Sequence, residues 1–207
     1  MLGIEVNGSL EGYSRIIPLR KMIEVDSISY FKNDVFYALI RNISIRGTNI
    51  KPYADSEIKA VYQGFEGLEV GQTFILRDKI LSIMENLSGN GLFRDFIMNG
   101  ISNMLPLQVY GKDSGGKKAI AFYIPAIVEI HNDEAVLLDG MHRTNICGSA
   151  GSAIKVIQIS KVGARLPFEP ISWRDIKSVD EKPDIGQRYV DLKPELFRDL
   201  SVVGIDG

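Results

Sequence analysis

The sequence predicts a mixed α+β protein, and three observations support this fold class. Apolar runs rich in β-branched residues at 126–131, 135–138 and 154–160 predict strands. The segment 76–87 carries apolar residues at 76, 80, 83, 84 and 87, which is the spacing of one face of a helix. Helices and strands of this kind alternate along the chain, in the order typical of a small α+β sheet domain.

The remaining elements are assigned by composition and by turn signals. Aromatic and β-branched residues predict strand at 34–41 and 43–45. Two further helices are predicted, each ended by a glycine: one at 92–98, which stops near Gly100, and one at 141–150, which stops at Gly151. Further expected elements are a loop at 51–55, strands at 106–110 and 119–124 joined by a turn at 112–117, a tight turn at 132–134 and a short helix at 192–198.

Length and composition predict one domain of 207 residues, with an N-terminal extension over 1–60, a core over 75–160 and a tail over 165–207 packed on the core. A net charge of −2, from 24 basic and 26 acidic residues, argues against DNA as a partner. One cysteine forms no internal disulfide, which suits the cytoplasm. No signal peptide and no apolar stretch of roughly 20 residues is recognised, so no membrane segment is expected. A homodimer is left open.

The most informative segment is Asp139-Gly140-Met141-His142-Arg143, which follows the apolar run 135–138. Asp-Gly predicts a sharp turn, and the residues after it can continue as a helix. The start of a helix is partially positive and suits an anion. An acid, an imidazole and a guanidinium at this start predict a phosphate-binding site.

Each residue of this motif has a functional and a structural interpretation. Asp139 is predicted to bind Mg²⁺ or to accept a proton, and its alternative role is a helix cap. His142 and Arg143 are predicted to contact phosphate, because arginine is a bidentate partner for phosphate. His131 is expected to be structural, and Cys147 to be a small buried side chain.

The motif resembles the signature of the ParB/sulfiredoxin superfamily. Segments 106–110, 125–129 and 154–159 resemble strands of that family, so the resemblance covers about residues 75–160 and leaves 1–60 and 165–207 outside it. In sulfiredoxins the nucleophilic cysteine stands directly before the His-Arg pair, where this chain has Met141. A thioether cannot become a thiolate nucleophile, so the sulfiredoxin reaction is not expected.

The resemblance implies a nucleotide site at the start of the helix that begins at residue 141. Its phosphate-binding residues would be Gly140, Met141, His142, Arg143 and Thr144. Lys79 and Arg94 lie on preceding predicted helices, where related proteins place groups near the ligand, and their alternative role is to cover a solvated helix face. Glu129, on the neighbouring strand, is a further candidate for a base or metal-linked residue, and is otherwise far from Asp139 or on the surface.

The first functional hypothesis is a Mg²⁺-dependent phosphotransferase that uses ATP or ADP on a small hydroxyl-bearing molecule, as the resemblance to free-serine kinases implies. The alternative is a ParB-like regulatory module that binds CTP or ATP without turning over a small molecule. ParB proteins carry a helical DNA reader after this domain. Four prolines between 167 and 194 leave little room for one here. A ParB-like nuclease ranks third, and an assembly protein without a working site is the remaining class.

Overall fold

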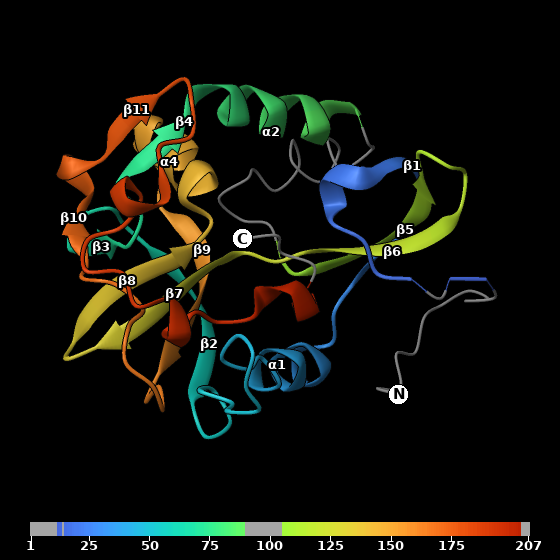
Figure 1. Cartoon of the computed structure of the whole chain (residues 1–207). Helices are drawn as coiled ribbons and strands as arrows, with labels where there is room; N and C mark the ends of the chain where they lie inside the picture. The colour runs from blue at the N-terminus through green and yellow to red at the C-terminus, as the bar shows by residue number, and fades with distance from the viewer. Residues whose placement is uncertain (1–11, 14, 90–104, 204–207) are drawn as a thin grey trace. The chain divides into compact units, whose positions relative to one another are not determined.

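The computed structural model describes residues 12–13, 15–89 and 105–203, and it is a mixed α+β structure, as the sequence predicted. The chain forms two compact units (Figure 1). The first unit comprises 1–40, 105–124 and 200–207, and the second comprises 41–104 and 125–199. These units cut across the expected extension, core and tail, because segments 1–40 and 105–124 share one unit.

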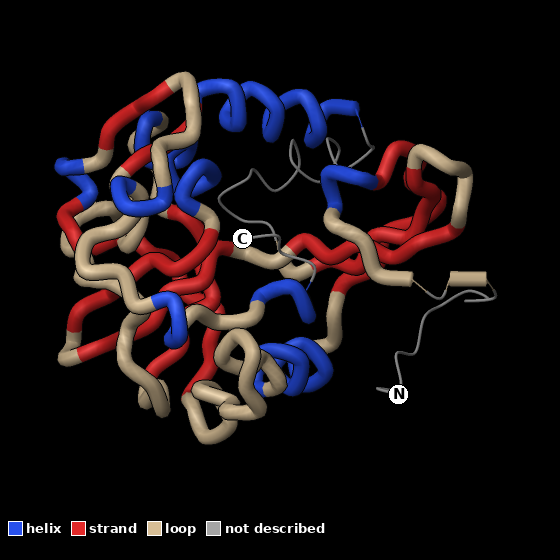
Figure 2. Tube along the Cα trace, viewed as in Figure 1, coloured by secondary structure: helices blue, strands red, loops and turns tan. Residues whose placement is uncertain are grey.

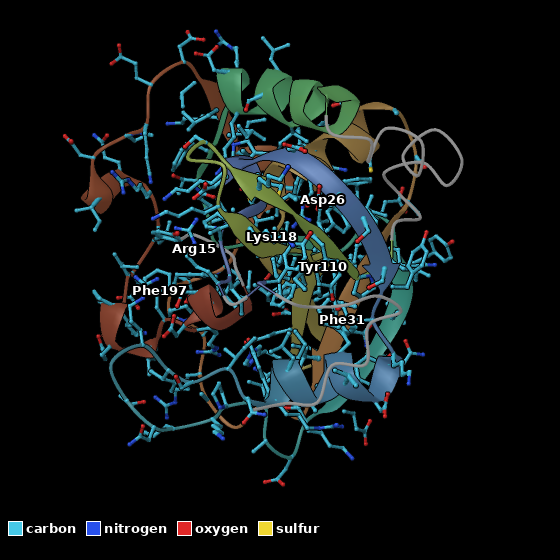
Figure 3. The ribbon with its side chains drawn as sticks, turned by 90° about the vertical axis from the view of Figure 1, so that its right-hand side faces the viewer. Arg15, Asp26, Phe31, Tyr110, Lys118 and Phe197 are labelled. Carbon is cyan, nitrogen blue, oxygen red and sulfur yellow. The ribbon has the colours of Figure 1, made fainter. Side chains whose placement is uncertain are left out.

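The first unit is built on a three-stranded antiparallel sheet with the order β1-β5-β6. Its strands are β1 (Met22–Tyr30), β5 (Leu107–Asp113) and β6 (Lys118–Tyr123), so the predicted strands at 106–110 and 119–124 are confirmed. A short helix, η1 (Leu19–Lys21), precedes β1. Figure 3 shows Asp26, Tyr110 and Lys118 gathered over this sheet. Tyr13 joins them, since its hydroxyl donates to Asp26 over 2.6 Å and the Lys118 ammonium lies 5.0 Å from its ring centre.

The strand predicted at 34–41 is wrong, because this segment forms the helix α1 (Asn33–Arg41). Phe36 and Ile40 stand four residues apart and are both buried, so they form one apolar helix face. Burial of this face outweighs the strand preference of the aromatic and β-branched residues. The strand predicted at 43–45 is absent too, and Ile45 forms only an isolated bridge with Arg198.

The second unit contains a six-stranded mixed sheet with the order β10-β3-β8-β7-β9-β2. Its strands are β2 (Glu57–Gln63), β3 (Leu68–Val70), β7 (Ala126–His131), β8 (Glu134–Asp139), β9 (Ile154–Ser160) and β10 (Ile171–Ser172). Pairs β3–β8 and β7–β9 are parallel, and the other pairs are antiparallel. The three strands that first predicted the fold class are confirmed and form the buried centre of this sheet.

A tight hairpin joins β7 to β8, as the sequence predicted. His131 pairs with Glu134, and Asn132 and Asp133 between them have φ of 50° and 67°. Asparagine and aspartate tolerate this left-handed conformation better than most residues, and two such residues make the turn that suits a hairpin. The hairpin fixes the register that delivers Asp139 to the end of β8.

Two helices of the second unit pack beside a small parallel sheet of β4 (Phe74–Leu76) and β11 (Lys177–Val179). The helix α2 (Arg77–Gly89) follows β4, and α4 (Met141–Ser149) follows β8, so the helices predicted at 76–87 and 141–150 are confirmed. Both contact β4 and each other (Figure 1). The helix predicted at 92–98, with Arg94 and Gly100, lies outside the described residues.

The chain after β9 is mostly loop (Figure 2). It contains the short helices η2 (Trp173–Asp175), η3 (Ile185–Gln187) and η4 (Pro194–Leu196), and η5 (Leu200–Val203) follows in the first unit. The short helix predicted at 192–198 is η4. Among the described residues, no helix combines the length and the apolar character that crossing a membrane requires.

Candidate functional site

The predicted motif forms a strand, a sharp turn and a helix. β8 ends at Asp139, Gly140 has φ of 94°, and α4 begins at Met141. A Cβ added to Gly140 would lie 2.6 Å from the Ala126 Cβ, so both the backbone angle and the space at this turn require glycine. Gly140 is the N-cap residue, and no side chain caps the helix, so the alternative role of Asp139 as a cap does not apply.

Asp139 and Arg143 form an ion pair at the start of α4. The Arg143 Nη2 donates to the Asp139 Oδ2 over 3.0 Å, across the turn that joins β8 to α4. The two side chains keep 24% and 16% of their surface exposed, so both groups can reach a ligand from solvent. The first N–H groups of a helix have no partner within it, and they add a positive end to the same corner. The pair therefore offers one anionic and one cationic group at an anion-binding position.

His142 has a role that the sequence did not predict. The residue is 8% exposed, and Nε2 accepts a hydrogen bond from the backbone N–H of Leu76 over 3.0 Å. Burial, with the nearby charges of Lys79 and Arg143, lowers the pKa of His142 to about 4. The imidazole is therefore neutral at pH 7 and joins α4 to the end of β4, so it is not a cationic phosphate ligand.

Acidification should destabilise the protein through His142. The pKa of about 4 in the folded chain lies below the ordinary 6.5, so the unfolded chain binds the proton more tightly. The contribution is complete above pH 6.5 and is lost as the pH falls from 6.5 towards 4, by about 2–3 kcal/mol. Urea unfolding of wild type and His142→Gln at pH 7 and pH 5 measures it. An equal pH dependence in the two proteins would contradict this assignment.

The other motif side chains turn inward. Met141 and Cys147 are 4% and 2% exposed, and burial raises the pKa of the Cys147 thiol despite the Arg143 charge, so the expected buried cysteine is confirmed. Thr144 is fully buried, and its backbone N–H donates to the Gly140 carbonyl. Its Oγ1 is the one buried side-chain polar atom among the described residues that lacks a hydrogen-bond partner. Of these three residues, only Met141 stands in the first turn with a backbone N–H that could serve a phosphate, because the Thr144 N–H is already bonded to Gly140 and Cys147 lies further along the helix.

Further charged groups act on residues near the pair, and the sequence did not reveal all of them. Lys79 is exposed on α2, and its charge lowers the pKa of His142, which indicates that it lies near this residue of the motif. Burial raises the pKa of Tyr189, while the charges of Arg188 and Arg46 lower it and that of Asp139 raises it. Arg46, Arg188 and Asp139 therefore all lie close enough to Tyr189 for their charges to act on it. Arg46, Arg188 and Tyr189 lie in segments outside the motif, and no local pattern marks them.

The structure places Glu129 in a separate buried cluster. Its carboxylate is fully buried, and Arg198 Nε and Nη2 donate to its two oxygens, each over 2.9 Å. The Tyr53 hydroxyl donates to Oε1 over 2.5 Å, and His131 Nε2 lies 2.6 Å from Oε2. Burial raises the pKa of Glu129, but these hydrogen bonds and the Arg198 charge outweigh it and hold the pKa below its ordinary value. Glu129 thus anchors the tail, with no free oxygen for a base or metal role.

The described residues contain no group of three or more histidine, cysteine, aspartate or glutamate side chains that could hold a metal ion. Asp139, the carboxylate predicted to bind Mg²⁺, stands two residues before the start of α4. Comparison with known proteins gives no match, whether against family models, curated proteins or solved structures.

Proposed function

We propose that the corner formed by Asp139, Arg143 and the start of α4 binds the phosphate groups of a nucleotide. We further propose that the protein is a Mg²⁺-dependent phosphotransferase acting on a small hydroxyl-bearing molecule. The observation that carries the proposal is the partly exposed Asp139–Arg143 pair at the glycine-capped start of a helix. Lys79 adds positive charge near His142, and Arg46 and Arg188 add it near Tyr189, which favours a multiply charged anion.

The residues would divide the work as follows. Arg143 can turn its guanidinium from Asp139 to a phosphate and bind two of its oxygens. The released Asp139 carboxylate can then take a proton from an acceptor hydroxyl, or serve as the protein ligand of Mg²⁺, which uses few carboxylates when phosphates supply its other oxygens. Phosphoryl transfer needs mainly positioning and charge neutralisation, which such a corner supplies.

The proposal includes a ParB/sulfiredoxin-like arrangement of segment 75–160. The turn from β8 into α4 and the strand β9 after it support this, because they follow the order that the resemblance implied. The expected phosphate contacts of Lys79 and His142 differ in outcome. Lys79 lies near the corner, whereas His142 is used inside the fold.

A thermal-shift panel with ATP, ADP, CTP and GTP, each with and without Mg²⁺, tests the proposal. A ligand at about 100 times its Kd adds about 2.7 kcal/mol, which raises the Tm by several degrees. A Mg²⁺-dependent shift with an adenine nucleotide supports the phosphotransferase and justifies a screen of acceptor hydroxyl compounds. A shift with CTP alone would replace it with the regulatory module, and no shift with any nucleotide would refute nucleotide binding.

Asp139→Asn should separate binding from turnover. The amide keeps the size of the side chain but neither accepts a proton at neutral pH nor balances Mg²⁺. We expect nucleotide affinity within about threefold of wild type and turnover lowered by about 10²–10⁴-fold, the range of a general base. Binding is measured by calorimetry and turnover by release of the product nucleotide. Unchanged turnover would exclude Asp139 as the catalytic group.

A further inference from the structure

The sheet topology brings Tyr189 to the level of Asp139. In the parallel pair of β3 and β8, Val70 is the partner of Leu137. Two residues further along the two strands stand Gln72 and Asp139. Gln72 pairs in an antiparallel bridge with Tyr189, so the tail places Tyr189 beside Gln72, at the level of Asp139. The Asp139 charge raises the pKa of Tyr189, which agrees with this placement of two residues 50 positions apart in the sequence.

Packing fixes the Tyr189 ring. Phe168 stacks on it with ring centres 5.5 Å apart and an angle of 13°, and Phe197 meets it edge-on at 5.4 Å. Phe168 itself lies against Gly71, where an added Cβ would be 2.0 Å from the Phe168 Cζ. The Arg46 guanidinium lies 5.7 Å from the centre of the Phe197 ring. A ring held from two sides leaves the hydroxyl as the group that can meet a ligand.

The Tyr189 hydroxyl is an available donor. No hydrogen bond joins it to another group within the described part of the chain. Among the described residues, Thr144 Oγ1 is the one fully buried side-chain polar atom without a hydrogen-bond partner. The Tyr189 oxygen has no partner among them either, so it must keep some exposure to solvent. The raised pKa keeps the phenol protonated at neutral pH. The charges of Arg46, Arg188 and Asp139 act on Tyr189, so its hydroxyl is a hydrogen-bond donor in a region suited to a charged ligand.

We propose that Tyr189 is a binding residue of the site and that its hydroxyl donates a hydrogen bond to the phosphate held by Arg143. The C-terminal tail then forms one wall of the site. This inference rests on the proposed function, because it takes the same anion as its ligand. The two donors differ in geometry, because the phenol donates one hydrogen bond along its O–H bond and the guanidinium donates two parallel bonds from a planar group. Together they would fix the orientation of the bound phosphate.

Calorimetric titration of wild type, Tyr189→Phe and Tyr62→Phe with Mg-ADP and with inorganic pyrophosphate tests the inference. Phenylalanine keeps the stacked ring and removes only the hydroxyl. We expect Tyr189→Phe to bind Mg-ADP about tenfold more weakly, because it loses one hydrogen bond to a charged group. Tyr62 lies on β2 and is 60% exposed, so its variant controls for loss of a tyrosine hydroxyl elsewhere. The Tm without ligand should be the same in all three proteins.

The outcomes separate the two proposals. Weaker binding of both ligands by Tyr189→Phe alone supports a contact to phosphate, and weaker binding of Mg-ADP only would move the contact to the nucleoside and overturn the assignment. Wild-type affinity in Tyr189→Phe, with binding still lost in Arg143→Ala, refutes the role of Tyr189 and leaves the proposed function standing. No binding by wild type refutes the proposed function, and with it this inference.

Discussion

Arg198→Met should lower the free energy of unfolding by about 3–5 kcal/mol, the cost of breaking a buried ion pair from one side. The Arg198 guanidinium donates twice to Glu129 and also to the carbonyls of Arg165 and Leu196, over 3.0 and 2.6 Å. Methionine fills much of the same space but leaves a buried carboxylate without its counter-charge. Tyr53 and His131 remain as hydrogen-bond partners of the Glu129 carboxylate.

Urea unfolding measures this loss of stability. A control variant and a double variant show whether the loss comes from the buried ion pair. Lys161→Met removes the exposed pair with Glu57 and should cost no more than about 1 kcal/mol, as surface pairs do. The double variant Glu129→Gln with Arg198→Met removes both charges, so it should be more stable than the sum of the two single effects predicts. Additive effects, or a loss below 1 kcal/mol in Arg198→Met, would show that the cluster does not anchor the tail.

This anchor could not be read from the sequence. Glu129 lies in an apolar strand next to the motif, which made a base or metal role a reasonable hypothesis. Its partner Arg198 lies 69 residues away in a tail without regular periodicity. A charged residue inside a buried strand does indicate that a partner exists, because an unpaired buried charge is too costly. The sequence does not indicate which residue that partner is.

Local patterns were sufficient where local forces decide the structure. The strands at 126–131 and 154–160 and the helix at 141–150 were predicted at nearly their observed bounds, because apolar runs and a glycine turn determine them. Segment 34–41 failed because its residues favour strand individually, whereas Phe36 and Ile40 are buried together in a helix. The four-residue spacing of that pair was the signal in the sequence for the helix.

The site was predicted in part for the same reason. Asp139 ends β8 and Arg143 lies in the first turn of α4, so the sharp turn at Gly140 between them is enough to bring the two side chains together. His142 is directed by tertiary packing to the Leu76 backbone, which a motif does not reveal. Arg188 and Tyr189 lie in the tail, which bridges to Gln72, and Arg46 meets the tail through its backbone N–H, which donates to the Phe197 carbonyl. Contacts between such distant segments leave no local pattern in the sequence.

Arg143→Ala should weaken nucleotide binding by about 10–100-fold and leave the fold intact. The guanidinium is the group at the start of α4 that can bind two phosphate oxygens, and charge-assisted hydrogen bonds are about twice as strong as neutral ones. The fold should tolerate the change, because Asp139 keeps 24% of its surface exposed and can be hydrated without its partner. Arg143→Lys should fall between wild type and alanine, since it keeps the charge and loses the fork.

Calorimetric titration with Mg-ADP measures these affinities, and Arg174→Ala is the matched control. Arg174 is an exposed arginine of the same unit, on η2 and outside the corner, so its loss lowers the net charge equally. If only the Arg143 variants lose affinity, the phosphate binds to this guanidinium. A loss caused by the overall charge of the protein would affect both alanine variants alike. Equal affinity in wild type and Arg143→Ala would remove the corner from the binding site. The Asp139–Arg143 pair would then be a structural link between β8 and α4.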